Sequence, residues 1–128
     1  MKCTVTHQGV PIGTVELPSS GDYFTVGVVP LGAYAAIQSL VRSASVALAD
    51  VALGREANTV ALQSAAALGR ALELRDSSGA FVPVDFIELT EWPRGTPEIA
   101  AFIRLRQAHA SLPAPLRPGR DGDPATAP

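Results

Sequence analysis

One stretch of the chain constrains its fold more than any other, because it carries a hydrophobic stripe with the period of an α-helix. The apolar positions recur three or four residues apart, at Tyr34, Ile37, Val41, Ala44, Leu48 and Ala52. Only one side of such a helix is apolar, so that side must pack against other elements. Gly54 follows as a natural terminator. We therefore predict a helix over residues 34–53.

The first residues of the chain predict a β-hairpin. Gln8 and Gly9 are suited to the centre of a tight turn, because glycine adopts positive φ at little cost. His7 then faces Val10, and directly paired residues share a face of the ribbon. One face carries Cys3, Val5, Val10 and Ile12. A third strand is predicted over Tyr23–Val29, which is rich in β-branched and aromatic residues and ends at Pro30.

A second hairpin is predicted around the sequence Asp76-Ser-Ser-Gly79. Aspartate favours the start of a type I turn, and glycine supplies the left-handed position that follows it. In this register Leu74 pairs with Phe81. One face then carries Leu72, Leu74, Phe81, Ile87 and Leu89, and the opposite face carries Val82, Val84 and Phe86.

Two further helices complete the predicted order β-β-β-α-α-β-β-α. Residues 58–69 are alanine-rich and helix-prone. A final helix over residues 96–112 is indicated by Thr96 as N-cap and Pro97 at the first helical position, with a stripe at Ile99, Phe102, Ile103 and Ala110. We therefore expect a single α+β domain over residues 1–112, with an antiparallel sheet of about five strands and the helices packed on one face.

The last sixteen residues, 113–128, contain five prolines and few residues that a core could bury. Such a composition predicts a disordered C-terminal tail. Residues 113–118, with the sequence PAPLRP, also fit a proline-rich motif that docks in aromatic grooves. A solvated tail is the simpler interpretation of this segment.

Charge and cysteine content exclude several classes of protein. Ten basic residues balance twelve acidic ones, and the nine arginines are scattered, which argues against nucleic acid as a partner. Cys3 is the only cysteine, so no intrachain disulfide can form. The N-terminus lacks the apolar region of a signal peptide, and no run is apolar enough to span a membrane. We expect a cytoplasmic protein.

Few residues are candidates for chemistry. Asp85 falls on the same predicted face as Ile87, where a buried carboxylate would have a raised pKa and could act as an acid. A bulge near Pro83, or an ion pair with an arginine such as Arg75, would instead turn it outward, and we favour this interpretation. Glu88 and His7 are the other catalytic candidates. We expect Cys3, too far from His7 to form a pair with it, to be a core residue.

No cofactor or nucleophile motif occurs in the sequence, and no spacing of His and Cys suggests a metal site. The limited polar surface favours a non-catalytic domain that binds a protein partner or itself, with Tyr34, Trp92 and Asp85 at the interface. The alternative is a small-molecule enzyme or binder with Asp85 or Glu88 in a pocket between sheet and helices. In that alternative, Tyr23, Tyr34 or His7 would orient the substrate.

Overall fold

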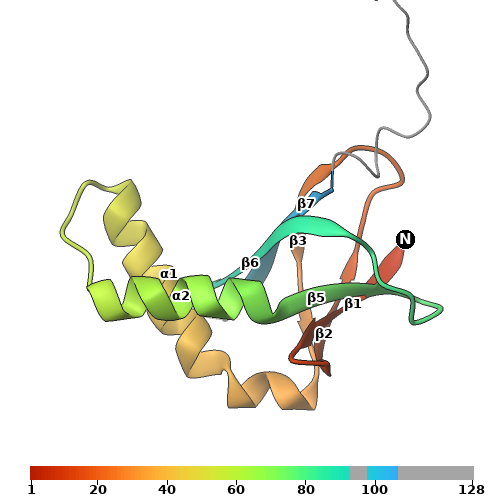
Figure 1. Ribbon diagram of the computed structural model, residues 1–128, viewed down its shortest axis with the longest axis horizontal. Helices are drawn as coiled ribbons and strands as arrows, with labels where there is room; N and C mark the ends of the chain where they lie inside the picture. Colours follow the sequence, from red (N-terminus) through yellow and green to blue (C-terminus); the bar gives the residue numbers. More distant parts are fainter. Residues whose placement is uncertain (93–97, 107–128) are drawn as a thin grey trace, which may run out of the picture.

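Two antiparallel sheets and a pair of helices surround a common hydrophobic core in the computed structural model, which describes residues 1–92 and 98–106 (Figure 1). The expected α+β class is confirmed, and the helices pack against a sheet. The strands, however, form one sheet of order β4-β2-β1-β5 and another of order β3-β7-β6, instead of a single five-stranded sheet. The elements are β1 Lys2–His7, β2 Val10–Glu16, β3 Tyr23–Gly27, β4 Val29–Pro30, a 3-10 helix η1 Gly32–Ala36, α1 Gln38–Ala52, α2 Thr59–Ala71, β5 Leu72–Asp76, β6 Val84–Trp92 and β7 Glu98–Leu105.

The first hairpin turns at the predicted residues. Gln8 and Gly9 both have positive φ, and His7 pairs with Val10. The register then shifts between Val5 and Thr6, which the regular alternation of the sequence did not reveal. As a result Val15 joins Cys3, Val5 and Ile12 in the core, whereas Val10 is exposed.

The predicted third strand divides between the two sheets. Residues 23–27 form β3 in the second sheet, and after Val28 the chain crosses to the first sheet, where Pro30 pairs with Gly13 of β2. Gly13 allows this crossing, because a Cβ atom there would lie 2.5 Å from the Val28 side chain and 3.2 Å from the Val29 carbonyl oxygen.

The second hairpin has the predicted turn and a different register. The Asp76 carboxylate accepts hydrogen bonds from the backbone N–H groups of Ser78 and Ala80, and Gly79 has positive φ. Phe81 pairs with Arg75 instead of Leu74, so its ring is exposed and lies 4.0 Å from the Arg75 guanidinium. Of the predicted inner face, Leu72, Leu74, Ile87 and Leu89 are buried.

Both central helices lie where the sequence predicted them. The chain enters α1 through η1, and Gly54 takes a left-handed conformation directly after the helix end. The side chain of Asn58 caps α2 by accepting a hydrogen bond from the backbone N–H of Ala61 at 3.0 Å.

The predicted C-terminal helix is wrong, because residues 98–105 form β7, the central strand of the second sheet. Ile99, Phe102 and Ile103 fit a helical stripe, but the inward positions are Ala101 and Ile103, with Phe102 and Arg104 facing outward. Pairing with β3 on one side and β6 on the other fixes the extended conformation. The proposed N-cap at 96–97, the domain boundary at 112 and the tail at 113–128 lie outside the described residues.

We predict that Gly13→Ala destabilises the protein by about 1–3 kcal/mol, because the added methyl group must displace the Val28 side chain and the Val29 carbonyl. Urea denaturation measures the change. Gly27→Ala is the matched control, since no atom lies within 4 Å of a Cβ built at this strand glycine. Equal stability of the two variants would contradict the close approach at Gly13.

Candidate functional site

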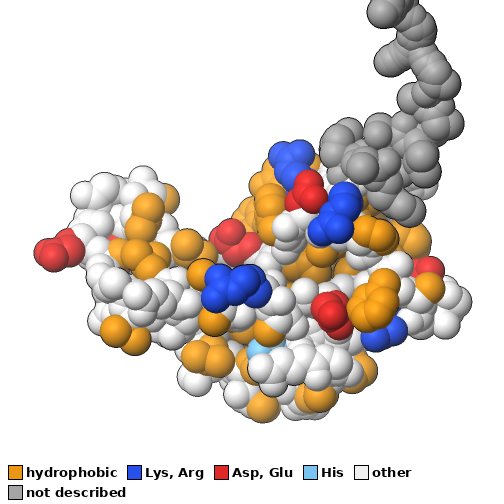
Figure 2. All heavy atoms as spheres, in the orientation of Figure 1, with side chains coloured by type: hydrophobic (Ala, Val, Ile, Leu, Met, Phe, Trp, Pro, Cys, Tyr) orange, Lys and Arg blue, Asp and Glu red, His pale blue; other side chains and the backbone are white. Residues whose placement is uncertain are grey.

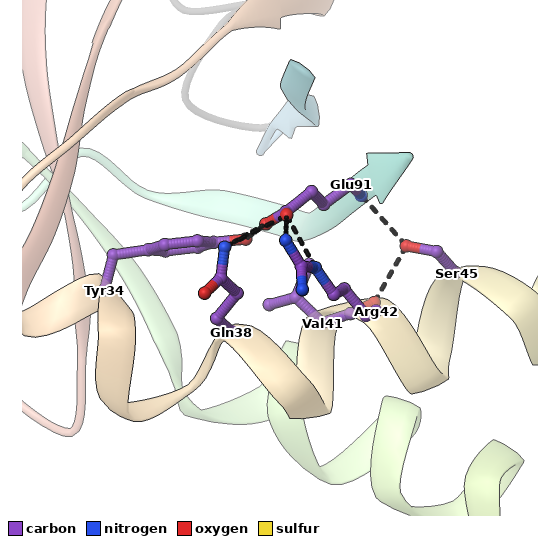
Figure 3. Close-up of polar contacts among 6 residues, drawn as sticks. All are labelled: Tyr34, Gln38, Val41, Arg42, Ser45 and Glu91. Atoms are coloured by element: carbon purple, nitrogen blue, oxygen red, sulfur yellow. Dashed lines mark hydrogen bonds and ion pairs between the residues drawn. The ribbon is translucent and has the colours of Figure 1, made fainter. Parts of the chain in front are cut away.

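A buried carboxylate, that of Glu91, joins the helices to the second sheet (Figure 3). Its side chain is 0 % exposed. The Tyr34 hydroxyl donates to Oε1 at 2.6 Å, and the Arg42 guanidinium donates to Oε2 from two nitrogens, each at 2.7 Å. Gln38 donates to the same carboxylate at 3.1 Å. The charge of Glu91 is thus compensated by one cation and by further donors.

The positions of these donors follow from helical geometry. Tyr34, Gln38 and Arg42 are four residues apart, so they lie on one side of the segment formed by η1 and α1. Glu91 comes from β6, and its side chain lies against this segment. Ser45 completes the junction, because its hydroxyl accepts the backbone N–H of Glu91 at 3.0 Å and donates to the Val41 carbonyl at 2.8 Å.

The donors control how Glu91 ionises. Burial by itself would raise its pKa, but the hydrogen bonds from Tyr34, Arg42 and Gln38 lower the pKa below its ordinary value. Burial and the same carboxylate raise the pKa of the Tyr34 phenol. Glu91 is therefore ionised and Tyr34 protonated at neutral pH. None of the network residues lines the groove described next, so the arrangement serves to attach α1 to β6.

An open groove of about 420 Å³ lies between the two helices and β6. Leu48 of α1, Leu62 and Ala65 of α2, and Ile87 and Leu89 of β6 make most of its walls apolar. At Gly69, α2 lies close to the strand: a Cβ atom added there would be 3.5 Å from the Ile87 carbonyl oxygen.

Opposite charges stand on the two walls of the groove. Arg70 belongs to the α2 wall, and Asp85 and Glu88 belong to the β6 wall. Figure 2 shows a basic group over the end of α2 facing an acidic group over β6. Asp85 pairs with Arg106 at 3.5 Å. Within residues 1–92 and 98–106, neither Arg70 nor Glu88 forms an ion pair.

The structure places the predicted site residues in separate locations. Asp85 turns outward at a register shift in β6, as favoured from the sequence, although its partner is Arg106 and not Arg75. Tyr34 is only 3 % exposed and offers no surface to a partner. His7 ends β1 beside the turn, where it pairs with Leu72 of β5 and does not itself line the groove, and Trp92 ends β6. Cys3 is a core residue whose burial raises the pKa of its thiol.

Sequence reasoning missed Glu91 as the central residue of this junction. The polar positions 38, 42 and 45 beside the apolar stripe were a signal for a buried partner, but the sequence does not say which acidic residue it is. Among the described residues, no three His, Cys, Asp or Glu side chains are grouped as a metal site would require, and no helix is long and apolar enough to cross a membrane. Comparisons with protein-family models, curated proteins and solved structures find no match to this chain.

We predict that Tyr34→Phe lowers the free energy of unfolding by about 1.5–3 kcal/mol, because it removes a hydrogen bond to a buried charge. Chemical denaturation measures the loss. Tyr23→Phe removes a hydroxyl from a ring that is 51 % exposed and serves as the control, with a change close to zero. Equal effects of the two substitutions would show that the Glu91 junction adds no stability.

The lowered pKa of Glu91 predicts a stability that depends on pH. The stability that ionised Glu91 contributes is fully present above the unfolded-state pKa of about 4.5. It is lost as the pH falls through the lower folded-state pKa. Asp76 also has a lowered pKa and adds a similar dependence, so the difference between wild type and Glu91→Gln isolates the effect. We expect this difference in unfolding free energy to shrink below about pH 4.5. A constant difference across that range would contradict the assignment.

Proposed function

We propose that this protein is a non-catalytic interaction domain that binds an apolar segment of a partner protein in the groove between the helices and β6. The observation that supports this most directly is the composition of the groove, whose walls are apolar and whose charges are few and opposite on the two sides. Protein segments that dock in grooves place apolar side chains against such walls and fix their direction with charges at the rim.

The helices themselves support an interaction role. Leu68 is the only residue of α2 that is fully buried, although most of the helix is apolar. Large apolar side chains are also exposed on the outer parts of the two helices, at Leu40, Val46, Val51, Leu53 and Val60. Apolar surface of this extent on a small domain is typical of binding sites.

The rim charges define the chemistry of the partner. A bound segment would carry an acidic side chain toward Arg70 and a basic side chain toward Glu88, on either side of an apolar centre. Asp85 keeps its intramolecular partner Arg106, so Glu88 is the more accessible of the two carboxylates for a new ion pair.

The groove volume favours a second candidate function, that of a small-molecule binder or enzyme. About 420 Å³ lies within the range of ligand sites in proteins. Glu88 or Asp85 would then bind a polar group of the ligand and supply any acid or base. If the groove binds a small molecule instead, a photoreactive residue placed in the groove will form no cross-link to a protein.

We predict that a photoreactive amino acid at position 66 cross-links the full chain to a partner protein in cells. Ala66 is exposed and lines the groove, whereas Ala67 is also exposed and does not line it, so position 67 is the matched control. Mass spectrometry of the adduct should identify an apolar peptide with an acidic and a basic residue on opposite sides.

A groove-filling substitution separates specific from random adducts. Ala65→Trp should abolish the adduct from position 66, because the indole occupies the volume that the segment needs. Equal cross-linking from positions 66 and 67, or an adduct that survives Ala65→Trp, would argue against the groove as the binding site.

A further inference from the structure

The outer face of the second sheet carries exposed aromatic side chains. Tyr23 of β3 and Phe86 of β6 both stand opposite Arg104 of β7, and their rings meet edge to face with centroids 6.1 Å apart. One step along the sheet, Phe102 stands between Thr25 and Glu88. We call the surface formed by Tyr23, Phe86, Phe102 and Arg104 the aromatic face.

This aromatic face is open to solvent. Tyr23 is 51 % exposed and Phe86 is 40 % exposed, and Phe102 is partly exposed. The Arg104 guanidinium lies 5.0 Å from the centre of the Tyr23 ring, which holds the ring in place without covering it on both sides. Exposed aromatic rings that are held in place on a surface are the usual receptors for proline-rich segments in the polyproline II conformation.

The chain contains such a segment directly after this sheet. Residues 115–120 have the sequence PLRPGR, in which two prolines three residues apart are followed by an arginine. Proline at this spacing favours the polyproline II helix, which has three residues per turn and therefore presents both prolines on one side.

We propose that residues 113–120 bind in cis to the aromatic face of the same chain. The prolines rest on the exposed rings of Tyr23 and Phe102, which stand on neighbouring strands of this face. This occupant replaces the solvated tail that composition alone suggests.

The position at which the described chain ends supports binding in cis. Arg106 follows β7 and is held to the same sheet by its backbone N–H, which donates to the Pro83 carbonyl at 3.1 Å. Six residues, 107–112, separate it from Pro113 and span at most about 20 Å. Phe102 lies only about 13 Å back along the strand. So short a connection gives the segment a high effective concentration at this face.

Paramagnetic NMR on the full chain tests the proposal. A nitroxide attached at Gly119→Cys should broaden the amide signals of Thr25, Phe102 and Arg104 while leaving Thr14 and Glu16 of β2 sharp. Cys3 is 1 % exposed, and the wild-type chain treated with the same reagent controls for its labelling. Tyr23→Ser, at an exposed position, should restore the broadened signals, as should the double substitution Pro115→Ala and Pro118→Ala.

Several outcomes would overturn this proposal. Broadening spread evenly over the chain, or unchanged by Tyr23→Ser and by the proline substitutions, would mean that the segment does not bind the aromatic face. The same broadening in a mixture of isotope-labelled chain and separate nitroxide-labelled chain would show binding to a second copy and exclude the cis arrangement. Of the aromatic face only Phe86 also lines the groove, and the test reads out Tyr23, Phe102 and the prolines, so failure here leaves the proposed function unaffected.

Discussion

The attachment of the helices to the sheet depends on one buried charge. Removing a carboxylate from water costs several kcal/mol, and only close compensation makes this tolerable. Glu91 receives that compensation from Tyr34, Gln38 and Arg42, all on the segment that enters and begins α1. An apolar contact would tolerate sliding of the helix along the strand, whereas these directional bonds fix one arrangement. The junction therefore sets where α1 lies and, through α1, where α2 can pack.

The groove lies beyond the part of α1 that the Glu91 contacts attach to β6. The Glu91 contacts secure the first half of α1, and α2 approaches β6 closely at Gly69. Between these points an open groove remains, and apolar residues such as Leu62 and Leu89 line it. Figure 1 shows the same feature at larger scale, since the far ends of α1 and α2 project beyond the strands. A better-packed hairpin would be more stable and would have no groove.

The sequence was sufficient for features that depend on neighbouring residues. Gln8 and Gly9 fixed one turn, Asp76 and Gly79 fixed another, and the stripe from Tyr34 fixed the first helix. The registers of the two hairpins were missed, because an irregularity such as the shift after Val5 or the pairing of Phe81 with Arg75 has no strong local signature. The Tyr34–Glu91 bond joins residues 57 positions apart, and one sequence carries no information about such a pair. The two walls of the groove likewise meet only through tertiary packing.

The wrong prediction of a helix over residues 98–105 also changes which side chains are expected on the surface. Ile99, Phe102 and Ile103 fit a helical stripe, whereas Ile99, Ala101 and Ile103 fit the alternation of a strand, and only pairing with β3 and β6 decides between the two. As a strand, the segment turns Phe102 and Arg104 to the outside, beside Tyr23 and Phe86. Only Phe24 and Tyr34 are fully buried among the described aromatic side chains, whereas Tyr23, Phe81 and Phe86 are exposed. Half of the described aromatic side chains are thus exposed, and three of the four that the core does not bury, Tyr23, Phe86 and Phe102, gather on one face of the second sheet.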